Sequence, residues 1–334
     1  MELKYKSYTL QLKQTFTTSH GSVDQRESVI VNFSDHNHVG YGECVAIQYY
    51  DKSINQFEES LSEIAGLLPR QKNSLDQMTE FIEEAVQDSF IQCALDIALH
   101  DFFAKKSKAS IRKALGLPFN CSTCSTLTIG ITSVEETKRF VQSNPWPIYK
   151  VKLGTSSDVE VIEAIRSLTD APLVVDANSG WDLEKTIEMS RWLKGQNVLY
   201  IEQPINASDK DAIANLTGKS SLPILADESC HGENDLPFCF EHFDGINIKL
   251  MKCGGITTAI RMLEKARINN KATMIGCMTE SSIGISAGAQ LISLFDFVDL
   301  DGALMLANDP ADGVKLHNGF FSYPDRFGHG AILI

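Results

Sequence analysis

Four short apolar runs, each ending in a charged residue, decide the fold: Tyr149-Lys-Val-Lys152, Leu173-Val-Val-Asp176, Val198-Leu-Tyr-Ile-Glu202 and Ile224-Leu-Ala-Asp227. Each run has the length and the β-branched or aromatic content of a buried strand, and helical patterns such as 159–168 lie between them. Strands that alternate with helices along the chain are typical of a parallel sheet covered by helices.

The same alternation continues on both sides of this stretch. Further β-type runs occur at 126–129, 246–249, 273–276 and 297–301, and a helical pattern fills 260–266. Eight strands with interleaved helices are typical of a (β/α) barrel. No G-x-G-x-x-G motif follows the first strand, so the sequence does not favour a dinucleotide-binding fold.

The first third of the chain has a different texture. Val29-Ile-Val-Asn-Phe33 and Val39-Gly-Tyr-Gly-Glu43 flank a polar turn, which predicts a β-hairpin, and helical periods follow at 57–68 and 89–106. We therefore predict an α/β protein with two domains. These are an N-terminal α+β capping domain at residues 1–118 and a (β/α)7β TIM-type barrel, the catalytic domain, at residues 119–310.

Composition limits the class of function. The net charge of −13 argues against binding to nucleic acid or to anionic membranes, which needs clustered Lys and Arg. No apolar run is long enough to cross a bilayer, and the amino terminus has no signal-peptide pattern. The eight cysteines are scattered, and Cys121-Ser-Thr-Cys124 has no second pair at zinc-ribbon distance. We expect a cytoplasmic protein with reduced thiols.

Three acidic residues end consecutive strands. Asp176, Glu202 and Asp227 would meet at the carboxyl end of the barrel, where such folds place their active sites. Carboxylates that converge in this way repel one another unless a cation lies among them. Hard oxygen ligands with open positions suit Mg²⁺, so we predict a magnesium site.

Two lysines lie on opposite sides of the same opening. Lys152 and Lys249 end strands that are four apart in a ring of eight, so their amines face each other. Burial, a neighbouring cation such as Lys150 and a metal ion all favour the neutral amine that a base requires. Two opposed amines beside a divalent cation fit abstraction of a proton next to a carboxylate, through an enediolate, and its return to the opposite face.

The chain resembles the enolase superfamily, in its muconate-lactonizing-enzyme subgroup, and most of all the dipeptide epimerases. The resemblance covers nearly the whole chain and extends the cap to include residues 311–334. Family members often form oligomers, so a homo-oligomer is an expectation from the resemblance alone. The motifs that carry it are Glu27-Ser-Val-Ile-Val31, Gly40-Tyr-Gly-Glu43, Ala94-Leu-Asp-Ile-Ala98, Tyr149-Lys-Val-Lys152, Val175-Asp-Ala-Asn178, Ile201-Glu-Gln-Pro204, Ala226-Asp-Glu-Ser229 and Asn247-Ile-Lys-Leu-Met-Lys252.

The resemblance also implies roles for individual residues. Lys152 and Lys249 become the acid/base pair, and the three acids become the Mg²⁺ ligands. The Asp-x-Asp of the last strand would bind the free ammonium group of a dipeptide, a role that two carboxylates aimed at one point also suit on physical grounds. The remaining assignments are Lys150 beside the substrate carboxylate, Asp299 and Asp301 at the ammonium group, Thr128 and Met278 lining the cavity, Asn178 and Glu228 as supporting groups near the metal, and Lys252 as a structural residue.

One departure bears on the substrate. In Ala-Glu epimerases of this family an arginine in the first cap loop contacts the glutamate side chain, and Gly21 occupies that position here. Arg26 follows five positions later, just before the predicted strand. An anionic side chain would lose its bidentate partner, so we predict a dipeptide with a small, uncharged C-terminal residue, Ala-Ala-like. The alternatives are an L-Ala-D/L-Glu epimerase, an o-succinylbenzoate synthase and an N-acylamino-acid racemase.

Overall fold

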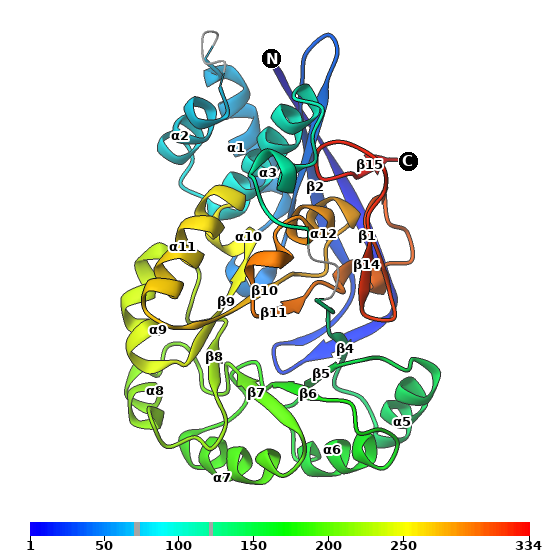
Figure 1. Ribbon diagram of the computed structural model, residues 1–334, viewed down its shortest axis with the longest axis vertical. Helices are drawn as coiled ribbons and strands as arrows, with labels where there is room; N and C mark the ends of the chain where they lie inside the picture. Colours follow the sequence, from blue (N-terminus) through cyan, green and yellow to red (C-terminus); the bar gives the residue numbers. More distant parts are fainter. Residues whose placement is uncertain (70–73, 120–122) are drawn as a thin grey trace.

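The computed structural model describes residues 1–69, 74–119 and 123–334, and its strands form a cap sheet and a barrel (Figure 1). The cap sheet is antiparallel, in the order β1-β2-β3. Buried residues of α1 and of the long helix α3 pack against one face of it. The cap elements are β1 (Glu2–Thr18), β2 (Gly21–Ser34), β3 (Val39–Val45), η1 (Gln48–Tyr50), α1 (Ile54–Leu67), α2 (Leu75–Ala85), α3 (Ser89–Lys106) and α4 (Ile111–Ala114).

The predicted cap hairpin is confirmed. In the β2–β3 pair, Phe33 lies opposite Gly40. Strand β2 is longer than predicted, however, because its first half pairs with β1, a strand that was not predicted. The β1–β2 turn reaches the barrel: Ile131 N donates to Thr17 O at 2.9 Å, and Ser19 Oγ donates to Asn178 O.

The barrel prediction is confirmed. Eight parallel strands run in the order of the sequence, and a hydrogen bond of 3.0 Å from Thr126 N to Val298 O joins the first strand to the last. The strands are β4 (Leu127–Ile129), β5 (Tyr149–Lys152), β6 (Leu173–Asp176), β7 (Val198–Glu202), β8 (Ile224–Ala226), β9 (Gly245–Lys249), β10 (Ala272–Gly276) and β11 (Phe297–Asp299). The helices are α5 (Val134–Ser143), α6 (Asp158–Arg166), α7 (Leu183–Lys194), α8 (Lys210–Leu216), α9 (Leu236–His242), α10 (Leu250–Cys253), α11 (Ile256–Ile268) and α12 (Ser282–Ala289).

The barrel interior explains where the charged residues lie. Val174, Tyr200 and Leu225 form a buried apolar cluster that also includes Met274. Side chains two positions apart on a strand share a face, so the residues two positions later also point inward. These later residues are the acids of β6, β7 and of the turn after β8. The apolar layer therefore forms a floor beneath the charged residues at the mouth.

The C-terminal segment returns to the cap. Strand β12 (Ala311–Asp312) pairs with β15 (Ile332–Leu333), and β13 (Lys315–His317) pairs with β14 (Phe320–Ser322). His329 N donates to Asp101 Oδ1 at 2.9 Å, and the His329 ring lies 3.0 Å from Tyr41 O. These contacts agree with a cap that includes 311–334, although the domain boundaries themselves stay a prediction.

The helices and cysteines bear on two predictions made from composition, the absence of a membrane-spanning segment and the reduced thiols. None of the helices in the described ranges combines the length and apolar character needed to cross a membrane. Cys121 lies outside the described residues, whereas Cys124, the other member of the C-x-x-C pair, is a free thiol.

Candidate active site at the barrel mouth

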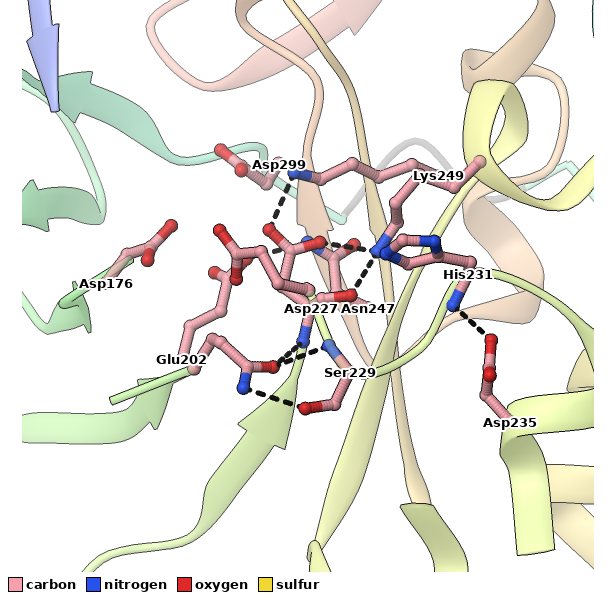
Figure 2. A network of polar contacts seen from close by, with 12 residues as sticks. Asp176, Glu202, Asp227, Ser229, His231, Asp235, Asn247, Lys249 and Asp299 are labelled. Carbon is pink, nitrogen blue, oxygen red and sulfur yellow. Dashed lines mark hydrogen bonds and ion pairs between the residues drawn. The ribbon is translucent and has the colours of Figure 1, made fainter. Parts of the chain in front are cut away.

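Three buried carboxylates meet at the carboxyl end of the barrel. Asp176 and Glu202 are wholly buried and Asp227 is 1% exposed. One oxygen from each lies within 4.8 Å of the others, and Figure 2 shows the three groups together at the strand ends. The cluster forms because parallel strands bring their last residues to one edge.

The electrostatics of the cluster fit a divalent cation. Burial, and then the charge of Asp176, raise the pKa of Glu202 to about 8. Asp176 behaves differently because Lys152 and Lys150 outweigh its burial and lower its pKa to about 2. Without a metal, Glu202 therefore holds a proton at neutral pH, whereas a divalent cation among the three carboxylates would favour its ionised form. An all-carboxylate site of this kind suits Mg²⁺.

The two lysines contact different members of this triad. Lys152 Nζ lies 2.6 Å from Asp176 Oδ2, and Lys249 Nζ lies 2.8 Å from Asp227 Oδ2. Burial favours a neutral Lys249, but Asp227 outweighs it and raises the pKa of Lys249 well above its usual value. The lowered pKa expected for a lysine base is therefore not found at Lys249, because the charge of Asp227 lies directly beside its amine.

Lys150 lies at the centre of the site. Its Nζ is 2.7 Å from Glu202 Oε2, 2.7 Å from Asp299 Oδ2 and 3.1 Å from Asp176 Oδ2. These carboxylates outweigh the effect of burial and raise the pKa of Lys150 well above its usual value. Lys150 is therefore a fixed positive charge that connects the triad to the last strand.

The two carboxylates of the predicted ammonium site have different hydrogen-bond partners. Asp299 accepts hydrogen bonds from Lys150 Nζ at 2.7 Å and from Thr126 Oγ1 at 2.5 Å. Asp301, just after β11, accepts a hydrogen bond of 2.6 Å from Thr128 N. Burial, and then the charge of Asp299, raise the pKa of Asp301 to about 7. Met278 follows β10 and is partly buried.

Asn178 and Glu228 lie together beside the triad. Asn178 N donates to Asp176 Oδ1 at 2.9 Å, and Asn178 Nδ2 donates to Glu228 Oε1 at 3.1 Å. Asn178 has a φ of 41° and Ser179 a φ of 64°, a strained conformation that is common at functional sites. Within the described ranges Asn178 Oδ1 and Glu228 Oε2 are buried without a hydrogen-bond partner.

The cap adds residues that sequence reasoning missed. His20 Nε2 lies 3.0 Å from Glu228 Oε1, and the His20 ring stacks on Tyr49 with centroids 4.0 Å apart. Tyr50 contacts His231 edge to face at 5.2 Å. These residues have no spacing that relates them to the barrel, so only the fold could bring them together.

Three interior residues were also missed or given no role at the site. Lys252 Nζ donates to Asp227 Oδ1 at 2.6 Å and to Asp227 O at 2.5 Å. Gln203 Oε1 accepts from Asp227 N at 2.9 Å, and Asn247 Nδ2 donates to Glu202 Oε1 at 2.8 Å (Figure 2). The sequence carried a usable signal for all three residues. Lys252 lies three positions after Lys249, Gln203 directly follows Glu202, and Asn247 lies two positions before Lys249.

In the first cap loop, which contains Gly21, the position of Arg26 differs from the prediction. Gly21 has a φ of 122°, and nothing lies within 4 Å of a Cβ built at this position. Arg26 lies within β2 opposite Leu10, not before the strand, and burial lowers its pKa.

Comparisons with known proteins agree with this architecture. Residues 2–116 match the mandelate racemase/muconate lactonizing enzyme N-terminal domain, and residues 132–333 match the enolase C-terminal domain-like family. The L-Ala-D/L-amino acid epimerase of Flavobacterium johnsoniae is 39% identical over the full length of both chains. The L-Ala-D/L-Glu epimerase of Bacteroides thetaiotaomicron is 36% identical over 100% of this chain and 88% of its own.

A solved structure extends the likeness to three dimensions. The dipeptide epimerase of Cytophaga hutchinsonii, complexed with Mg and the dipeptide D-Ala-L-Val, has a TM-score of 0.92 and 27% identity, over 99% of this chain and 95% of its own. The chain belongs to the mandelate racemase/muconate lactonizing enzyme family of the enolase superfamily. Within it the chain is an isomerase of the epimerase and racemase group, and Mg²⁺ is the cofactor that its acidic triad fits.

Proposed function

We propose that this protein is a Mg²⁺-dependent dipeptide epimerase that inverts the Cα of the C-terminal residue by a two-lysine 1,1-proton transfer. The observation that carries the proposal is the pair Lys152 and Lys249, which approach one carboxylate cluster from strands β5 and β9. Relatives named dipeptide or L-Ala-D/L-amino acid epimerases support the substrate class.

Each lysine serves one face of the substrate. One neutral amine removes the Cα proton, and the ammonium on the other side donates a proton to the opposite face, so the charge balances over the cycle. When bound by Asp176, Glu202 and Asp227, Mg²⁺ would supply positive charge next to the substrate carboxylate. Lys150 would add a second fixed charge at the same place, and Asn178 and Glu228 would support the metal ligands.

The other end of the dipeptide would lie at β11. We propose that the free ammonium group binds Asp299 and Asp301. Both residues are buried, with exposed fractions of 5% and 3% respectively. Asp301 is the more available of the two, because Asp299 already accepts from Lys150. Thr128, within β4, and Met278, after β10, would line the cavity between the two ends.

The substrate side chain is proposed to be small and uncharged, as in Ala-Ala-like dipeptides. The support is Gly21, which places no cation in the cap loop that reaches Asn178. The alternative of an L-Ala-D/L-Glu epimerase is favoured by the Bacteroides thetaiotaomicron relative. The free cysteines in the described ranges suit the cytoplasm, where we place the protein.

A deuterium-exchange screen tests the proposal. The protein with Mg²⁺ is incubated in D₂O with LL, LD, DL and DD dipeptides, and mass spectrometry detects exchange at Cα. We expect a gain of one mass unit for a small set of dipeptides. The gain should be lost with EDTA, and Lys152→Ala, which keeps only Lys249 as a base, should lose it for one epimer of each pair. Exchange with no dipeptide would reject the proposal.

The rival reactions need a separate control. An o-succinylbenzoate synthase or an N-acylamino-acid racemase acts on substrates without a free ammonium group. Asp301→Asn should therefore reduce exchange of free dipeptides strongly and exchange of their N-acetyl forms little. Equal losses for both would count against the ammonium assignment while leaving the epimerase itself in place.

A further inference from the structure

We propose a second binding site, for a small oxyanion such as a phosphate monoester, in a cavity formed by the end of α3, by α4 and by the C-terminal segment. The cavity has a volume of about 200 Å³. It is lined by residues 108–110, 112 and 113, by Gln290 after α12, and by residues 323–327, 329 and 330. None of these residues belongs to the barrel mouth, so the inference does not depend on the proposed reaction.

The charge of the cavity is opposite to that of the protein. Lys108, Arg112, Lys113 and Arg326 line it, against the single acid Asp325, in a chain whose net charge is −13. His329 adds no charge at neutral pH, because burial lowers its pKa.

Most of these cations have no counter-ion. Arg326 pairs with Asp312 at 2.8 Å. Lys108, Arg112 and Lys113 have no ion pair within residues 1–69, 74–119 and 123–334. Three uncompensated positive charges around one cavity favour a ligand with one or two negative charges.

Arg112 gives the site its geometry. Its guanidinium carbon lies 3.9 Å from the Phe119 ring centroid and 4.6 Å from the Tyr323 ring centroid. Arg112 Nη1 is buried and has no hydrogen-bond partner in the described part of the chain. The two aromatic rings fix the guanidinium plane, and Arg112 is one of the residues that line the cavity. A planar fork of this kind matches carboxylate and phosphate oxygens.

Helix α12 separates this cavity from the active site. It begins four residues after Met278, and Gln290 follows its last residue. Gln290 Oε1 accepts a hydrogen bond of 3.3 Å from Arg112 N, which holds α4 to this end of α12. Eight residues span on the order of 12 Å, so the cavity lies one helix length from the mouth.

Calorimetric titration tests the site. The protein, free of added dipeptide, is titrated with inorganic phosphate at constant ionic strength, with chloride as the blank and citrate as the carboxylate arm. We expect one phosphate per chain and a rise in Tm with phosphate concentration. Arg112→Gln should weaken binding about tenfold or more, because a charge-assisted contact is lost. Arg191→Gln, an exposed arginine on α7, is the matched control and should leave binding unchanged.

Each outcome decides the proposal. No phosphate or citrate binding up to about 50 mM, or binding that Arg112→Gln leaves intact, would overturn it, since carboxylate and phosphate contacts both need the fork. If citrate binds better than phosphate with the same dependence on Arg112, the ligand is a carboxylate and the site stands. If Arg112→Gln fails to fold, the exposed Lys113→Gln provides the same test, with a loss of about threefold expected because one charge is removed.

Discussion

The Lys152 side and the Lys249 side of the barrel mouth carry the same chemical group but are built differently. Lys152 contacts Asp176, and Gly154, two positions later, lines a cavity of about 570 Å³ together with the cap residue His20. Lys249 contacts Asp227, whose other oxygen is held by Lys252 at 2.6 Å. The exposed fractions of the two lysine side chains are nearly equal, 10% and 9%, so the difference lies in their neighbours. We call the side of Lys152 and Gly154 the open side, and the side of Lys249, with its second lysine, the filled side.

The difference has a chemical consequence. In the proposed mechanism Lys152 and Lys249 serve opposite faces of one carbon and are equivalent, but the surroundings of the two lysines are unequal. On the Lys249 side, Tyr50 and His231 contact each other above the turn after β8. We therefore expect the two directions of epimerisation to respond differently to mutation, and the following predictions test this difference.

The largest effect should come from removing either lysine. Lys152→Ala and Lys249→Ala should each lower epimerisation about 10²–10⁴-fold, the usual contribution of a general acid or base. Each variant keeps the other base, so it should still exchange the Cα proton of one stereoisomer. Exchange is measured in D₂O with each epimer separately. If both variants exchange the same stereoisomer, the two lysines do not serve opposite faces.

Removing Lys252 should damage the filled side. Lys252→Met leaves buried Asp227 without one of its cations, so we expect the free energy of unfolding to fall by about 3–5 kcal/mol without metal. Mg²⁺ should raise the Tm of this variant more than that of the parent protein, because it neutralises the same carboxylate. The control on the open side is Lys185→Met, which breaks the partly exposed pair with Asp158 at 2.9 Å.

The outcome for the control sets the scale. A partly exposed pair contributes about 0–1 kcal/mol, so Lys185→Met should change stability little. If Lys252→Met and Lys185→Met lower the free energy of unfolding equally in chemical denaturation, the two sides do not differ in stability as we expect.

The pH dependence of stability should also depend on the filled side. Glu280 follows β10, and burial, then the charge of Glu43, raise the pKa of Glu280 to about 8, above its ordinary value of 4.5. The folded state therefore holds this proton more tightly than the unfolded state. Its contribution to stability is complete below pH about 4.5 and is lost as the pH rises through about 8.

Glu280→Gln should remove this slope. Chemical denaturation between pH 5 and 8 should show a flatter profile for the variant, by up to about 1 kcal/mol per pH unit. The control is Glu163→Gln, at an exposed acid of α6. This variant should have the same pH profile of stability as the parent protein. An unchanged slope in Glu280→Gln would mean that other groups cause it.

The smallest effect is expected at the cap loop on the open side. Gly21→Arg adds a side chain whose Cβ has no atom within 4 Å, but at a φ of 122° any side chain costs about 1–3 kcal/mol. We expect a gain of a few-fold in exchange of Ala-Glu relative to Ala-Ala. Ser22→Arg, one position later, controls for added charge alone. No gain for Gly21→Arg over Ser22→Arg would remove Gly21 as the reason for an uncharged substrate.

The amino-acid sequence was sufficient for the parts of the site that are periodic. Strands end at regular intervals, and side chains two apart share a face, so Asp176, Glu202 and the lysines could be placed together from the sequence alone. The sequence analysis did not predict β1, although Leu3, Tyr5, Leu10 and Leu12 lie between polar residues along it, an alternation typical of a strand. Nor could it find the contact between His20 and Glu228, which are 208 positions apart.

The return of the C-terminal segment has a consequence for biosynthesis. Ile30 of the cap packs in one apolar cluster with Ala311 and Ala331, and His329 completes the hydrogen bonds of Asp101. A ribosome makes the cap sheet before these partners, so the apolar surface around Ile30 stays uncovered until residues 311–331 have emerged. A nascent or prematurely terminated chain therefore exposes an apolar surface that chaperones must shield. Loss of residues 329–331 would destabilise the N-terminal cap sheet as well as the C-terminal segment.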